Sequence, residues 1–185
     1  MSSVDLLHPI WESYRLLKDS SVVTKRALNR EWESSEEQKS FFDGTDFLSD
    51  TKSEASESVD KSLQSIEDLM ILSLYATFER YIIECLQEKG GSIRRERPEW
   101  LSDKLYLRFE NSIEKGSLDE VFSWFKNAQV IDSELCEDLK KTKMYRDWIA
   151  HRNPKRKPQE ISDPATVYSI LSTAIEKIDS VFHIH

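Results

Sequence analysis

The sequence predicts an all-α protein, an up-and-down bundle of about five or six helices that forms a single domain over 1–185. Only four glycines and five prolines interrupt the 185 residues, too few for the many turns of an all-β protein. Apolar side chains recur at helical spacing in several long segments. The length is about that of one ordinary domain, which is enough to bury a core.

Charge and hydropathy narrow the possible functions. Charged residues make up 32% of the chain and the formal net charge is −8, so nucleic acid is repelled on average and any site for it must be local. The longest nearly apolar run, 69–78, is shorter than the roughly 20 residues that cross a bilayer, and no cationic, cleavable apolar start is present. We therefore expect a cytoplasmic protein without a membrane partner. Cys85 and Cys136 form no Cys-x-x-Cys pair, which predicts two small buried side chains and no zinc site.

The first segment is predicted to be a long amphipathic helix followed by a loop. Pro9 suits a first helical turn, and loosely helical apolar spacing continues from it to about Phe42. Segment 43–58 is dense in Ser, Asp and Glu with little to bury, which predicts a flexible loop.

The next helix is the most apolar of the chain and should lie at the centre of the bundle. Its main stripe consists of Leu63, Ile66, Met70, Leu74, Phe78, Tyr81 and Cys85. It should end at Gly90 and Gly91, because glycine readily adopts the positive φ that ends many helices.

Four shorter helices should follow. Pro98 fits the first turn of a helix that ends near Gly116, and Ser117 with Glu120 forms a capping box for one that ends near Asn127. Asp132 or Ser133 can cap a fifth helix, which should end close to His151. Asp163 and Pro164 are a cap and first turn for a sixth.

One histidine, His151, is the main candidate for a catalytic residue. The sequence contains no Gly-rich phosphate loop, no His-Glu-x-x-His motif and no Gly-x-Ser-x-Gly motif. His151 lies at the end of the fifth helix with Asp147 four residues before it, so a carboxylate on the same helix face can orient the imidazole. Arg146 is adjacent, and a guanidinium is well suited to a phosphate.

A dense basic patch surrounds this motif in an otherwise acidic protein. Such asymmetry is typical of local phosphate binding. The predicted phosphate-binding residues are Lys143, Arg152, Asn153, Lys155, Arg156 and Lys157. Spacing alone favours a simpler interpretation, in which cations and a histidine near a helix C-terminus complement the helix dipole.

Two features resemble the HEPN superfamily, in its bacterial toxin and defence type. Arg146-Asp147-xxx-His151 is similar to the Arg-x4-His motif of those domains, late in a helical domain and followed by one more helix. Segment 74–82, Leu-Tyr-Ala-Thr-Phe-Glu-Arg-Tyr-Ile, resembles the central helix of bacterial members. The resemblance extends from about Leu63 onward.

This resemblance implies a metal-independent endoribonuclease without a cofactor, the toxin of a toxin–antitoxin pair or another defence system. It implies a homodimer with two motifs facing one cleft, and a possible antitoxin partner. His151 would act as general acid or base on a ribose 2′-hydroxyl, and Arg146 would stabilise charge on the phosphate. Asp147 would hold the histidine or help to position the RNA.

Two residues are candidate supports for this site. Glu79 lies in an apolar stretch of the central helix. It could contact Arg146, because a buried carboxylate needs a partner, or it could lie solvated on the helix face. Trp148 lies beside the motif and could be core, a dimer contact or a platform for RNA bases.

Two other functions stay open. A non-catalytic HEPN module could dimerise or bind a partner such as a nucleotidyltransferase-like antitoxin. A helical adaptor unrelated to the family would use the basic patch only as a capped helix end.

Overall fold

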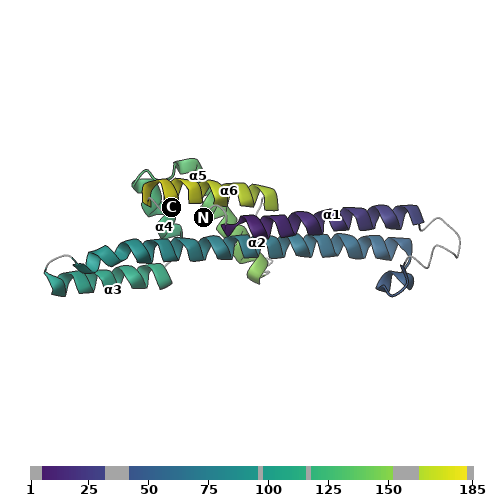
Figure 1. The fold of residues 1–185 in the computed structure, drawn as a ribbon, viewed down its shortest axis with the longest axis horizontal. Coiled ribbons are helices and arrows are strands. Elements are labelled where there is room, and N and C mark those ends of the chain that lie inside the picture. The colour runs from purple at the N-terminus through teal and green to yellow at the C-terminus, as the bar shows by residue number, and fades with distance from the viewer. Residues whose placement is uncertain (1–5, 32–41, 96–97, 116–117, 152–162, 183–185) are drawn as a thin grey trace. The chain divides into compact units, whose positions relative to one another are not determined.

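A computed structural model describes residues 6–31, 42–95, 98–115, 118–151 and 163–182 (Figure 1). Its α-helices are α1 (His8–Glu31), α2 (Lys52–Gly90), α3 (Glu99–Lys115), α4 (Leu118–Asn127), α5 (Ser133–His151) and α6 (Pro164–Phe182). Two short 3-10 helices are η3 (Asp46–Leu48) and η4 (Gly91–Arg95). The described residues include no β-strand, which confirms the all-α helical bundle. Among these helices, none has the length and hydropathy needed to cross a membrane.

The backbone divides into two compact units, and the single domain over 1–185 stays a prediction. The N-terminal unit consists of Ile10–Met70. The C-terminal unit consists of Met1–Pro9 together with Ile71–His185. The long helix α2 contributes its first part to the N-terminal unit and its second part to the C-terminal unit.

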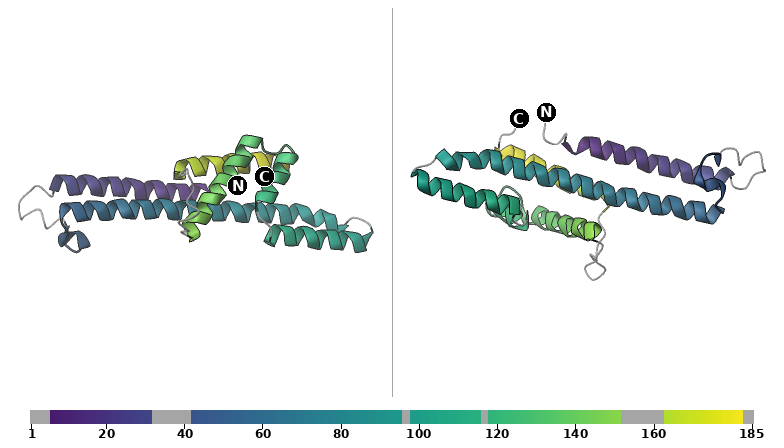
Figure 2. Two further views of the ribbon diagram at one scale, coloured as in Figure 1. Left: turned by 180° about the vertical axis from the view of Figure 1, so that it is seen from behind. Right: turned by 90° about the horizontal axis from the view of Figure 1, so that it is seen from below.

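The N-terminal unit pairs α1 with the first part of α2 in an antiparallel arrangement (Figure 2). Tyr14 donates a hydrogen bond to Glu67 at 3.1 Å, and Lys25 forms an ion pair with Asp60. A small apolar cluster of Leu28, Phe42, Ala55 and Val59 is buried in this unit, with Phe47 packed against it. Helix α1 begins near Pro9 as predicted, and its predicted extension over 32–41 lies outside the described residues.

The predicted loop over 43–58 is wrong in its second half, because α2 begins at Lys52. Thr51 and Glu54 form a capping box: the Thr51 N–H donates to the Glu54 carboxylate at 2.8 Å, and the Glu54 N–H donates to the Thr51 hydroxyl at 3.3 Å. The first of these bonds lowers the pKa of Glu54. Ala55 and Val59, one turn apart, extend the apolar stripe backwards from Leu63.

Helix α2 ends at Gly90 as predicted, but this glycine does not have the predicted backbone role. Among the described glycines only Gly44 has a positive φ, so Gly90 does not end the helix through left-handed backbone. A Cβ at Gly90 would lie 2.9 Å from Cδ1 of Phe109, and nearer still to Cε1. Gly90 is therefore required by the close approach of α3 to α2.

The second part of α2 is the central helix of the C-terminal unit, as the sequence predicts. Phe78 is fully buried, and its ring centroid lies 6.2 Å from that of Phe122 in α4. Tyr81 donates a hydrogen bond to Asp179 in α6. Helix α5 contributes four buried apolar side chains to this unit, those of Leu135, Leu139, Tyr145 and Ile149.

Aspartate caps begin the last two helices where the sequence predicts them. The Leu135 N–H donates to the Asp132 carboxylate at 2.8 Å, and this bond is the main cause that lowers the pKa of Asp132. The Thr166 hydroxyl and backbone N–H both donate to Asp163, which lowers the pKa of that carboxyl too. These caps fix where α5 and α6 start, and therefore where the motif at the end of α5 lies.

Both cysteines belong to the C-terminal unit and are buried free thiols, as predicted. Cys136 is fully buried, with its Sγ 3.7 Å from the carbonyl oxygen of Phe122. Burial raises the pKa of Cys85 to about 11, so this thiol is unreactive at neutral pH.

Candidate functional site

Arg146 is the best-held charged side chain of the predicted motif. Its Nη2 donates to Oε2 of Glu79 on α2 at 3.0 Å, so of the two alternatives open for Glu79 the structure has the contact with Arg146. Its Nη1 lies 3.0 Å from Oδ1 of Asp147, the next residue of α5. The side chain of Arg146 is 23% exposed, so part of it still reaches solvent.

An aromatic ring supports the same guanidinium from a third direction. Cζ of Arg146 lies 4.5 Å from the ring centroid of Tyr75, which is fully buried on α2. Tyr75 precedes Glu79 by four residues, so one face of α2 supplies both the ring and the carboxylate. Arg146 is thus fixed between two helices by two ion pairs and a cation–π contact.

Lys143 forms ion pairs within the protein. Its Nζ lies 3.2 Å from Oδ2 of Asp119 on α4 and 3.4 Å from Oδ2 of Asp147 one turn along α5. This described cluster sets two cations, Arg146 and Lys143, against three carboxylates, those of Glu79, Asp119 and Asp147. With a net charge of −1 it does not attract a polyanion by itself.

The two roles of Lys143, ion pairing and phosphate binding, predict different results for Lys143→Met. Methionine keeps the aliphatic stem and removes the charge, so ion pairing predicts a free energy of unfolding lower by about 0.5 to 1.5 kcal/mol. Urea unfolding measures this loss. The matched control is Lys141→Met, because Lys141 is 62% exposed with its Nζ 3.8 Å from Asp138. Unchanged stability together with weaker RNA binding would instead show that Lys143 acts as a phosphate contact.

His151 is exposed at the last residue of α5. The predicted pairing with Asp147 is not found among the described residues, where the Asp147 carboxylate contacts Lys143 and Arg146. Arg146 and His151 are five residues apart, which places them about 140° apart around the axis of a regular helix. A single copy of α5 therefore directs these two side chains to different sides.

The aromatic residues of the motif stack on each other. Tyr145 is buried as a core residue, and the half-buried ring of Trp148 stacks on it with centroids 5.8 Å apart and planes at 26°. This contact accounts for one face of Trp148 without deciding between its three predicted roles. The other predicted phosphate-binding residues lie outside the described residues, namely Arg152, Asn153, Lys155, Arg156 and Lys157.

Sequence reasoning missed two residues of this cluster. Tyr75 lies in the quoted segment 74–82 and has a helical signal, since it is one turn before Glu79. Asp119 has none, because it is 24 residues from Lys143 and meets it only through the packing of α4 on α5. Among the described residues, no group of three or more His, Cys, Asp and Glu side chains is placed to hold a metal ion.

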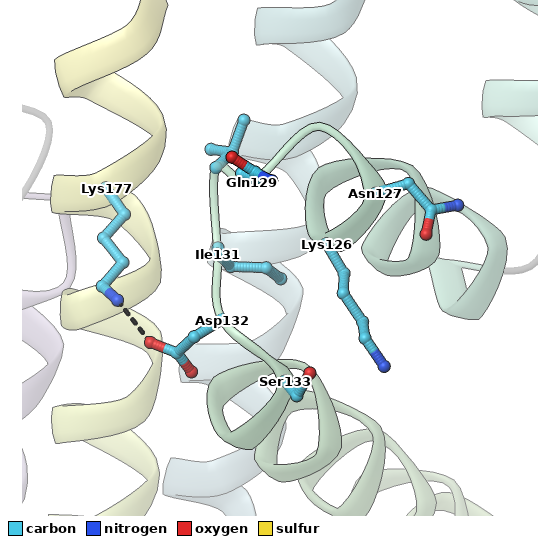
Figure 3. Close-up of a pocket in the computed structure, with 8 residues that line it drawn as sticks. Lys126, Asn127, Gln129, Ile131, Asp132, Ser133 and Lys177 are labelled. Carbon is cyan, nitrogen blue, oxygen red and sulfur yellow. Dashed lines mark hydrogen bonds and ion pairs between the residues drawn. The ribbon is translucent and has the colours of Figure 1, made fainter.

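A separate open pocket of about 590 Å³ lies at the other end of α5 (Figure 3). Its polar lining consists of Lys126, Asn127, Gln129, Asp132, Ser133 and Lys177. Lys177 extends from α6 to the Asp132 carboxylate at 2.6 Å, and the same carboxylate caps α5. The anion position at this helix start is therefore filled by the protein's own side chain.

Comparison with known proteins adds no assignment. No family model, no curated protein and no solved structure matches this chain.

Proposed function

We propose that this chain is a HEPN-type, metal-independent endoribonuclease of the cytoplasm, the toxin of a toxin–antitoxin pair or another defence system. The observation that carries the proposal is the Arg146 side chain, which is held by ion pairs and partly exposed, with an exposed histidine five residues later on the same helix. Such a cation can stabilise charge that develops on a phosphate, and an exposed imidazole can transfer protons.

In the proposed reaction the ribose 2′-hydroxyl attacks its neighbouring phosphorus. A base accepts the hydroxyl proton, an acid protonates the departing 5′-oxygen, and the products are a 2′,3′-cyclic phosphate and a 5′-hydroxyl. His151 takes one of these proton-transfer roles, and Arg146 stabilises the phosphorane charge. Asp147 and Glu79 orient Arg146.

A homodimer would bring together the catalytic groups that a single copy directs to different sides. Arg146 and His151 of one α5 point to different sides, and the reaction requires both an acid and a base. A two-fold axis beside α5 would bring His151 of one copy towards Arg146 of the other. The exposed Met144 lies one turn before Trp148, and the two form an apolar face of α5 suited to such a contact.

Incubation of the purified protein with labelled single-stranded RNA and DNA, both in excess chelator, tests this proposal. We expect RNA cleavage that leaves cyclic phosphate ends and no cleavage of DNA, because DNA lacks the attacking 2′-hydroxyl. Equal cleavage of DNA, or loss of RNA cleavage in chelator, would rule out this mechanism.

A second candidate is a non-catalytic HEPN module that binds a partner, such as a nucleotidyltransferase-like antitoxin. It is favoured by the pairing of both terminal nitrogens of Arg146 with carboxylates and by the net negative charge of the described cluster. An absence of cleavage across varied RNAs would favour this function.

A further inference from the structure

Tyr75 is a buried residue that the proposed reaction does not use directly. It is 0% exposed, and its ring lies under the guanidinium of Arg146, whose Cζ is 4.5 Å from the ring centroid. A cation over an aromatic face is held more strongly where water is excluded, as it is around this ring.

The ring, and not the hydroxyl, makes this contact. Among the described residues neither the Tyr75 hydroxyl nor Nε of Arg146 has a hydrogen-bond partner. Burial raises the pKa of Tyr75 far above its ordinary value, so the hydroxyl stays neutral and does not compete with Glu79 for the cation.

The contacts of Arg146 restrict its orientation in complementary ways. The carboxylates of Glu79 and Asp147 hold the two terminal nitrogens at 3.0 Å each, which fixes directions within the guanidinium plane. The Tyr75 face restricts motion out of that plane. Without the ring, the two carboxylates alone would allow the guanidinium to tilt between them.

We infer that Tyr75 is a positioning residue for Arg146, acting through its aromatic face to fix the guanidinium where it stabilises the charge of the phosphorane. This inference rests on the proposed ribonuclease function. It assigns Tyr75 no contact with RNA, since the side chain is fully buried.

Tyr75→Phe and Tyr75→Leu separate the ring from the hydroxyl. The phenylalanine variant should cleave saturating RNA at the wild-type rate, because it keeps the aromatic face and removes a hydroxyl without a partner. The leucine variant should be about 100-fold slower at saturating RNA with an unchanged KM, because a small misplacement of a catalytic group has an effect of that order. Wild-type rates for leucine, or an equal loss for phenylalanine, would overturn the inference.

A measurement on Arg146 itself keeps the test valid if leucine loosens the fold or if no RNA is cleaved. The NMR signal of the Arg146 Nε–H, assigned by its loss in Arg146→Lys, should be shifted upfield by the ring current of Tyr75. Tyr75→Phe should keep that shift and Tyr75→Leu should abolish it. An Arg146 signal that is unmoved in the leucine variant shows that the ring does not hold the guanidinium, whatever the activity. If the wild-type protein shows the upfield shift but cleaves no RNA, the proposed function is refuted and the contact between Tyr75 and Arg146 still stands.

Discussion

Replacing His151 with alanine should slow the cleavage of single-stranded RNA by at least about 100-fold, because a positioned acid–base group contributes about 10² to 10⁴ to such a reaction. The free energy of unfolding should change by less than about 1 kcal/mol, because His151 is exposed at the last residue of α5 and contributes only through the helix dipole. Initial cleavage rates in excess chelator and urea unfolding measure the two quantities on the same preparation.

The matched control is His8→Ala, which removes another exposed histidine, at the start of α1. It should cleave RNA at the wild-type rate. A His151→Ala protein with wild-type activity would remove His151 from the mechanism. Mixing His151→Ala with Arg146→Ala should restore part of the activity if the site is shared between two copies, since a mixed dimer retains one intact pair.

Phe122→Ala should lower the free energy of unfolding by about 3 to 5 kcal/mol, the usual cost of truncating a buried phenylalanine. Phe122 is fully buried on α4 and packs against Phe78 of the central helix, so the cavity would open between two elements of the C-terminal unit. Against a typical total of about 5 to 15 kcal/mol, this loss removes a large part of the stability. Chemical denaturation monitored by circular dichroism measures it.

Leu107→Ala provides the comparison within the same unit. Leu107 is 52% exposed on α3, so its truncation should change the free energy of unfolding by no more than about 0.5 kcal/mol. A Phe122→Ala loss as small as that of the control would contradict the central position of the Phe78–Phe122 contact.

Local signals predicted the helices that carry strong caps. Asp132 and Asp163 mark the starts of α5 and α6, and in both cases the predicted cap is the observed one. The start of α2 was missed because the Ser, Asp and Glu content of 43–58 outweighed a capping box, Thr51-x-x-Glu54, that the sequence also contains. The composition of a segment indicates only how polar it is on average. A capping box depends on two particular side chains three residues apart, so a polar segment can still begin a helix.

Only part of the site was predictable from the sequence. Glu79 could be linked to Arg146 because an acidic residue in an apolar stretch needs a partner. The pairing of Lys143 with Asp119 depends on how α4 packs on α5, which no periodicity within either helix encodes. Asp147 was assigned to His151 by spacing, but the cations of Lys143 and Arg146 lie closer to it and compete for the same carboxylate.

The placement of the two thiols makes the C-terminal unit separately observable. Cys85 and Cys136 are the only cysteines of the chain and both are buried there, whereas 10–70 contains none. A maleimide or disulfide reagent therefore reacts only when the C-terminal unit opens, and its labelling rate reports the opening free energy of that unit alone. The native chain thus carries a built-in probe that can follow how RNA or an antitoxin changes the protection of the helices around Arg146, without any added label site.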